Sequence, residues 1–161
     1  MTTERVRPMQ HKKEARRPLD SGEYEVLAAF RHTLRHFLSF SEAAAAEMGL
    51  AAQQYQALLA IKGCGGRDTV TINELAHLLL IKHNSAVGLV DRLEGEGLVK
   101  RSTAPEDRRK VNLRLTRKGA RVFEQLATVH RDELQRIGPK LSEFLDHFSH
   151  YPKQAAPRPD R

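Results

Sequence analysis

The sequence is poor in aromatic residues and in cysteine. It has no tryptophan, and Phe and Tyr make up only 6% of its 161 positions, so Leu and Ala must form most of the core. The single cysteine, Cys64, excludes an internal disulfide framework and is typical of a reducing compartment. No apolar run approaches the roughly 18 residues of a membrane-spanning helix, and no secretory signal is visible. We therefore expect a soluble cytoplasmic protein that has no membrane partner.

Motifs of the common enzyme classes are also missing. There is no nucleophile elbow, phosphate-binding loop or zinc signature, and the glycines of residues 63–66 lack the strand–turn–helix frame of a dinucleotide site. His32 and His36 could share a helix face, as could His147 and His150, but no cysteine or carboxylate completes a metal site. We therefore expect no catalytic residue, no metal and no cofactor.

Positive charge is what the sequence has in excess, with a net charge of +7. Residues 100–118 contain eight Lys or Arg and two acids, residues 1–20 have a net charge of +3, and residues 152–161 add +2. The rest of the chain is mildly acidic. Charge concentrated in one segment and two tails points to an anionic partner, with nucleic acid as the first candidate.

The spacing of apolar residues predicts a mainly helical chain with one β-hairpin. Residues 1–20 and 152–161 are polar and contain prolines, so we expect a flexible basic arm and a disordered tail. Helices are expected at residues 22–48, 51–62, 72–80 and 84–95, then after residue 119 until Pro139 breaks the helix, and over residues 141–148. The hairpin strands are expected at residues 98–102 and 110–116.

Polar residues mark several of the expected helix starts. Asp20 or Ser21 would cap the first helix, and Asn84 or Ser85 would start the fourth. Thr71 and Glu74 form the pattern of a capping box at the third helix, after a short strand over residues 69–71.

Two short helices, a tight turn and a basic hairpin follow one another in the order of a winged helix-turn-helix. A recognition helix needs small polar residues on its first turns to enter the major groove, and Asn84 and Ser85 meet that need. Residues 110–116 alternate in polarity, so one face of this strand would be buried while Lys110 and Arg114 face the DNA backbone.

Two stretches in this order resemble the MarR family of transcriptional regulators. They are INELAHLLLIKHNSAVGLVDRLEGEGLVKR, residues 72–101, and DRRKVNLRLTRKG, residues 107–119. The resemblance implies a fold that is mainly α with a small β-hairpin wing, in a single domain. That domain would cover residues 21–151, with the winged helix-turn-helix at about 50–118 and dimerisation helices at about 22–48 and 119–150.

The resemblance also implies a function. Members of the family are homodimers that bind a pseudo-palindromic operator in double-stranded DNA, and most are repressors released by a small aromatic effector. Asp107 would brace Arg109, which would enter the minor groove. The implied DNA-binding residues are Asn84, Ser85, Val87, Asp107, Arg108, Arg109, Lys110 and Arg114. The implied effector pocket lies near His32, Arg35, His36 and Tyr55.

Some positions depart from the family pattern. Ala104 and Glu106 replace a frequent Asp and Arg, Gly88 stands where a longer residue is common, and Lys82 occupies the usual Ser or Thr cap. We expect these changes to bear on base specificity rather than on DNA binding itself.

Two alternatives stay open from the sequence. Cys64 would be a redox switch if a basic neighbour, such as Lys62 or Arg67, lowered its pKa. A basic protein of this kind could also bind DNA without sequence preference. A footprint separates the two modes of DNA binding, because only a specific regulator protects a palindrome of defined length.

Overall fold

A computed structural model describes residues 18–65, 67, 69–103 and 111–149. The fold is mainly α with a small antiparallel sheet, as predicted. None of the helices in the described ranges is long and apolar enough to cross a membrane. The elements are α1 (Ser21–Glu47), α2 (Ala52–Lys62), β1 (Val70–Thr71), α3 (Ile72–Leu78), α4 (His83–Gly95), β2 (Val99–Thr103), β3 (Val111–Leu115) and α5 (Arg117–Ser149).

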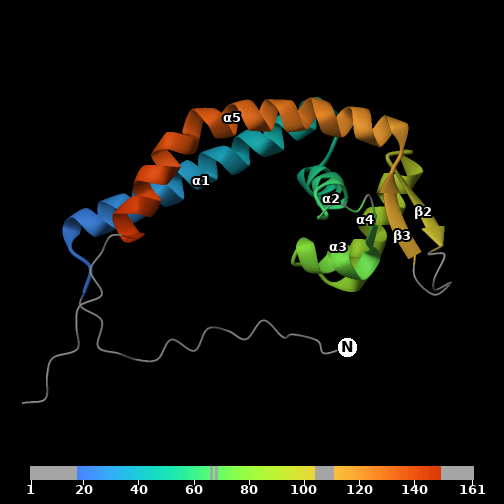
Figure 1. Ribbon diagram of the computed structural model, residues 1–161, viewed down its shortest axis with the longest axis horizontal. Helices are drawn as coiled ribbons and strands as arrows, with labels where there is room; N and C mark the ends of the chain where they lie inside the picture. Colours follow the sequence, from blue (N-terminus) through green and yellow to red (C-terminus); the bar gives the residue numbers. More distant parts are fainter. Residues whose placement is uncertain (1–17, 66, 68, 104–110, 150–161) are drawn as a thin grey trace, which may run out of the picture.

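The two long helices, α1 and α5, lie side by side as an arm, and the smaller elements form a compact unit at one end of it (Figure 1). Helix α5 starts beside the sheet and runs back along α1, so that the rings of Phe30 and Phe144 meet edge to face with their centroids 6.0 Å apart. The first and last helices of the described chain therefore pack against each other.

The compact unit, which we call the winged domain, has a core of aliphatic side chains. Each element buries one face, as expected from the spacing of the apolar residues. The fully buried side chains include Leu58 and Ile61 of α2, Leu75 of α3, Leu89, Val90 and Leu93 of α4, and Val70, Val99 and Leu113 of the sheet.

The sheet has the strand order β1-β3-β2, with Val70 opposite Leu113 and Lys100 opposite Arg114. Strand β1 leads directly into the capping box of α3, which is confirmed. The Thr71 hydroxyl accepts from the backbone N–H of Glu74 at 3.2 Å, and the Glu74 carboxylate accepts from the backbone N–H of Thr71 at 2.7 Å. These bonds from Thr71, aided by Arg67, lower the pKa of Glu74.

Helix starts agree with the predictions where a side chain caps the helix. Asp20 caps α1, and its carboxylate accepts from the backbone N–H of Glu23 at 2.9 Å. The prediction that Asn84 or Ser85 starts α4 is wrong, because the helix begins at His83 and Lys82 is its cap residue. Lys82 offers no side-chain cap bond, and its carbonyl simply accepts from the backbone N–H of Ala86 at 3.0 Å.

The prediction that Pro139 breaks the last helix is also wrong. Helix α5 continues through Pro139 and bends in its C-terminal part (Figure 1). Proline removes one N–H, so the carbonyl of Gln135 loses its helical partner. Contacts beyond the proline, such as that of Phe144 with Phe30, keep the last turns helical against α1.

Candidate nucleic-acid interface

Helices α3 and α4 are joined by a turn that backbone bonds close. The N–H groups of Leu80 and Ile81 donate to the carbonyls of His77 and Ala76, at 3.1 and 3.0 Å. Leu80 has a φ of 55°, in the left-handed region that favours glycine. The tight turn sets α4 against α3 through buried Ala86 and leaves the opposite side of α4 outside the core.

That outer side of α4 carries the residues predicted for the recognition helix. Asn84 and Ser85 are exposed in its first turn, as is His83, and Val87 is partly buried. The first turn of a helix also presents backbone N–H groups without helical partners. Small polar side chains beside such N–H groups can donate to phosphates or to base edges.

Strand β3 shows the predicted alternation. Leu113 is fully buried, and the neighbouring Arg114 is exposed on the other face. The remaining residues predicted for the wing, which are Asp107, Arg108, Arg109 and Lys110, lie outside the described residues. The bracing of Arg109 by Asp107 therefore stays a prediction.

Arg101 links strand β2 to helix α4. Its guanidinium lies 2.6 Å from the carboxylate of Asp91 and also pairs with that of Glu94, which in addition accepts from the backbone N–H of Arg101 at 3.2 Å. Partial burial acts to lower the pKa of Arg101, but hydrogen bonds and the charges of both acids outweigh it and raise the pKa. The pairing holds the wing in a set orientation to α4.

Sequence reasoning missed this role, because it counted Arg101 with the basic surface of the hairpin. The signal was present in the stretch LVDRLE, since Asp91 and Glu94 are three residues apart and share a helix face.

A second junction ties the start of α5 to the end of α4. The Thr116 hydroxyl donates to the carbonyl of Gly97 at 2.6 Å and accepts from the backbone N–H of Gly119 at 3.0 Å. A Cβ atom on Gly119 would lie 2.0 Å from the carbonyl oxygen of Leu98, so only glycine fits there. The Thr and Gly of the stretch LTRKG therefore act in packing the wing base.

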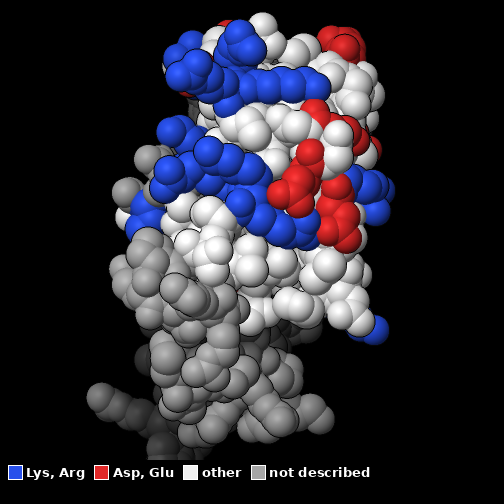
Figure 2. Space-filling model, turned by 90° about the vertical axis from the view of Figure 1, so that its right-hand side faces the viewer, with Lys and Arg blue, Asp and Glu red and all other residues white. Residues whose placement is uncertain are grey.

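The face formed by the sheet and the start of α5 carries bands of Lys and Arg with a group of acids to one side (Figure 2). Arg101 is engaged by acids, and the ammonium of Lys118 donates to the carbonyl of Glu96 at 2.8 Å. Lys100, Arg114 and Arg117 are exposed cations of the same segment. The basic surface is thus partly structural and partly open to a partner.

The four residues predicted for the effector pocket do not share one environment. His32, Arg35 and His36 are exposed on α1, where the two imidazole rings meet edge to face at 4.4 Å. Tyr55 is buried, which raises its pKa, and its ring stacks on that of His130 at 4.4 Å. A pocket formed by all four therefore stays a prediction.

His130 is a buried residue that sequence reasoning did not single out. Its two ring nitrogens lie 2.7 Å from the carbonyl oxygen of Leu126 and 2.7 Å from the hydroxyl of Ser41. Phe37 of α1 meets the same ring edge to face at 6.1 Å. The histidine thus joins α1, α2 and α5 where the arm meets the winged domain.

Cys64 lies next to a basic residue, as the redox alternative requires. The Arg67 guanidinium is 3.3 Å from the Cys64 sulfur and 3.1 Å from the Glu74 carboxylate, and hydrogen bonds with both raise the pKa of Arg67. In the part of the chain that the structure describes, no three His, Cys, Asp or Glu side chains come together as a metal site would need.

Two helices joined by a tight turn, followed by an antiparallel hairpin tied to the second helix, define a winged helix-turn-helix protein. Residues 48–110 match the model of the MarR family. The winged domain of this chain is a MarR-family domain, and the resemblance read from the sequence is confirmed.

Individual proteins agree with this assignment. The HTH-type transcriptional regulator YfiV of Bacillus subtilis is 35% identical over 74 residues, which are 46% of each chain. The chain spans about half the length of the curated relatives it matches.

Solved structures share the fold over more of the chain. RV1404 of Mycobacterium tuberculosis has a TM-score of 0.65 at 22% identity, covering 88% of this chain and all of that one. A variant of S. aureus MepR, solved bound to an oligodeoxyribonucleotide, has a TM-score of 0.59 at 21% identity, covering 78% and 89%.

Proposed function

We propose that this protein is a transcriptional regulator of the MarR type that binds a pseudo-palindromic operator in double-stranded DNA as a homodimer and represses transcription. The supporting observation is the exposed polar first turn of α4, held beside a basic strand by the pairing of Arg101 with Asp91 and Glu94. A protein of the same fold, MepR, was solved bound to DNA. We expect no catalytic activity and a cytoplasmic location.

The proposed contacts divide into two kinds. Asn84 and Ser85 would hydrogen-bond base edges or phosphates in the major groove, with Val87 beside them. Arg114 would pair with the phosphate backbone as an exposed cation of β3. At the wing tip, Arg108, Arg109 and Lys110 would follow the minor groove, with Asp107 holding Arg109 in place.

The proposed dimer is supported by an apolar side of the arm. Tyr24, Leu27 and Leu38 are exposed on α1, and their spacing sets them on one side of the helix. Leu134, Leu145 and Phe148 are exposed on α5. A second copy of the chain would cover these side chains and hold two recognition helices about 34 Å apart, one turn of DNA.

We expect a small aromatic effector to release the operator, as in most of the family. The contact between Arg67 and Cys64 favours a redox-responsive regulator as the second candidate. Loss of a peroxide response in Cys64→Ser, with operator binding intact, would identify the second candidate.

A footprint with two variants tests the proposal. Wild type should protect a palindrome of defined length. Asn84→Ala should weaken operator binding by about 1–3 kcal/mol and binding to unrelated DNA much less, because a base contact is lost. Arg114→Gln should weaken both equally and reduce the salt slope by about one unit, because a phosphate contact is lost.

Arg131→Gln is the matched control, since Arg131 is an exposed cation in the middle of α5, outside the winged domain. Its operator affinity should equal that of wild type. Equal affinity of wild type for all duplexes would instead identify a non-specific DNA-binding protein.

A further inference from the structure

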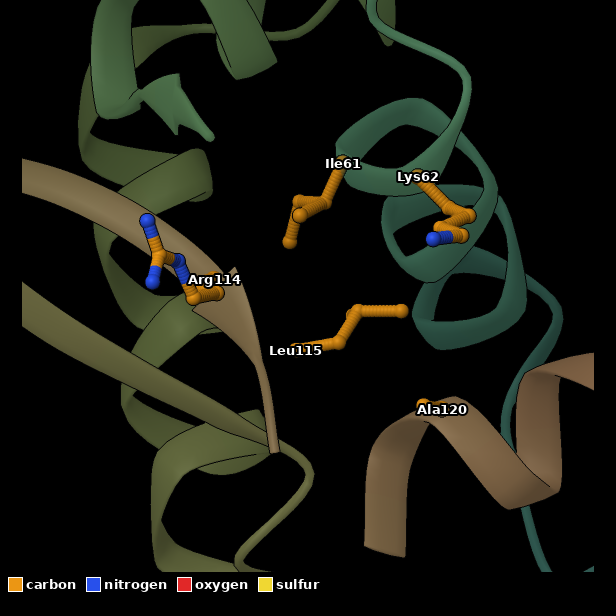
Figure 3. A pocket seen from close by; sticks show the side chains of 5 residues that line it. All are labelled: Ile61, Lys62, Arg114, Leu115 and Ala120. Carbon is orange, nitrogen blue, oxygen red and sulfur yellow. The ribbon is translucent and has the colours of Figure 1, made fainter. Parts of the chain in front are cut away.

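A cavity of about 190 Å³ lies between α2, β3 and the first turn of α5 (Figure 3). The described residues that line it are Ile61, Lys62, Arg114, Leu115 and Ala120. None of them belongs to α1 or to the residues that the sequence predicts for an effector. The cavity is therefore a separate candidate site, inside the winged domain.

The lining combines an apolar surface with two cations. Ile61, Leu115 and Ala120 supply the apolar surface, and Lys62 approaches from α2 while Arg114 lies across the cavity on β3 (Figure 3). Like charges on two sides of an apolar hollow repel each other, and an anion between them relieves that repulsion. A carboxylate suits this position, because it accepts two parallel hydrogen bonds from a guanidinium.

The volume limits the ligand. At about 30 Å³ for each water molecule, the cavity holds roughly six waters. It is smaller than the roughly 300–1,000 Å³ pockets that hold drug-sized ligands. A ligand with about eight non-hydrogen atoms fits, such as a carboxylate with a short hydrocarbon chain.

Arg114 connects the cavity with the proposed DNA surface. Its side chain is exposed and its guanidinium extends along β3 (Figure 3), so rotation about its side-chain bonds can direct it toward the cavity or toward a phosphate. One guanidinium cannot make the same bidentate bonds to a carboxylate and to a phosphate at the same time. Binding at either site therefore weakens binding at the other by the same factor.

The geometry points to a binding site for a small amphipathic monocarboxylate in this cavity, which competes with DNA for Arg114. The competition rests on the proposed DNA-binding function, whereas the site itself does not. The two parts are therefore tested separately.

The site is tested without DNA, with sodium hexanoate as the probe and the full chain labelled with ¹⁵N. Hexanoate should shift the amide signals of Ile61, Leu115 and Ala120 saturably, while hexylamine, a cation of the same length, should not. Ala120→Phe, which fills the cavity, and Lys62→Gln should each raise the dissociation constant at least tenfold. Arg117→Gln removes an exposed cation that does not line the cavity and should bind hexanoate like wild type.

Shifts that do not saturate would overturn the site. Equal binding by wild type, Ala120→Phe and Lys62→Gln would overturn it as well, and Lys62→Gln keeps the test valid if Ala120→Phe does not fold.

The competition is tested by operator titration with hexanoate or chloride at equal ionic strength. Hexanoate should raise the dissociation constant of wild type at least fivefold above the chloride value. Lys62→Gln should keep the operator affinity of wild type in chloride and lose most of the hexanoate effect. Saturable hexanoate binding that leaves operator affinity unchanged would overturn the competition through Arg114. Absence of any operator binding would contradict the proposed function, while the signals in the DNA-free titration still decide the site.

Discussion

Leu80 adopts a backbone conformation that leucine rarely occupies. Its φ is 55°, and 87% of its surface is exposed, so the side chain gains almost nothing from burial that could offset the strain. Left-handed geometry costs about 1–2 kcal/mol for a residue with a Cβ atom. The strain lies in the turn that leads into α4, directly before the proposed DNA-binding surface.

Leu80→Gly should therefore raise the free energy of unfolding by about 0.5–1 kcal/mol. The relieved strain of about 1–2 kcal/mol exceeds the roughly 0.5–1 kcal/mol by which glycine favours the unfolded chain. Denaturant unfolding followed by circular dichroism measures the difference. Leu78→Gly makes the same change at the end of α3, where φ is not positive, and should lower stability by about 1 kcal/mol. Equal losses in the two variants would show that Leu80 is not strained.

Single residues differ in how far the sequence predicts their roles. The exposure of Asn84 and Arg114 follows from local periodicity, and the structure agrees. The pairing of Arg101 with Asp91 and Glu94 joins residues seven and ten positions apart on different elements, so a charge count could not separate it from open surface. His130 was missed for the same reason, because its partner Ser41 lies 89 residues away.

At the scale of elements, the base of the wing is a close junction between the end of α4, β2 and the start of α5. Gly97 has a φ of 70° after the end of α4, and its carbonyl binds the Thr116 hydroxyl at 2.6 Å. Gly119 lies against the carbonyl of Leu98 at a distance that excludes a Cβ atom. The direction in which α5 leaves the sheet depends on this junction.

Gly119→Ala should lower the free energy of unfolding by at least about 2 kcal/mol, because the added methyl group must displace the backbone at Leu98. Gly95→Ala is the matched control, since it is also helical and a Cβ atom there meets nothing within 4 Å. The control should be stabilised by up to about 1 kcal/mol. Thermal unfolding of both variants measures the contrast, and a stable Gly119→Ala would mean that α5 can shift without cost.

Local chemistry also explains which element boundaries could be predicted. The capping box of Thr71 and Glu74 needs only residues three positions apart, so the sequence contains all of it. The persistence of α5 through Pro139 depends on packing against α1, which no local pattern describes. The start of α4 at His83 was missed because Lys82 is a cap residue without a capping side chain.

The whole molecule consists of a winged domain on a long two-helix arm (Figure 1). The arm leaves large apolar side chains exposed, including Leu38 at 52% and Leu145 at 58%. Since a stable dimer interface of this kind buries on the order of 2,000 Å² or more, both helices would have to contribute to it.

Leu38→Glu and Leu145→Glu should therefore each shift the protein toward monomer. Both residues are already exposed in the single chain, so the substitutions should cost little in the stability of the monomer itself. Sedimentation velocity at micromolar concentration measures the shift. Leu59→Glu, on the winged domain, changes a leucine of similar exposure and should leave the dimer intact. A wild-type chain that sediments as a stable folded monomer would contradict the dimer.

The pairing of α1 with α5 has a consequence for biosynthesis. The ribosome makes Ser41 long before its partner His130, and at about 5–20 residues per second the 89 residues between them take roughly 4–18 s. The winged domain lies between the two helices in the chain, so most of its core emerges while α1 still has no partner. The first helix to be translated is thus among the last to be covered, and for several seconds its apolar side is open to chaperones or to a neighbouring nascent chain.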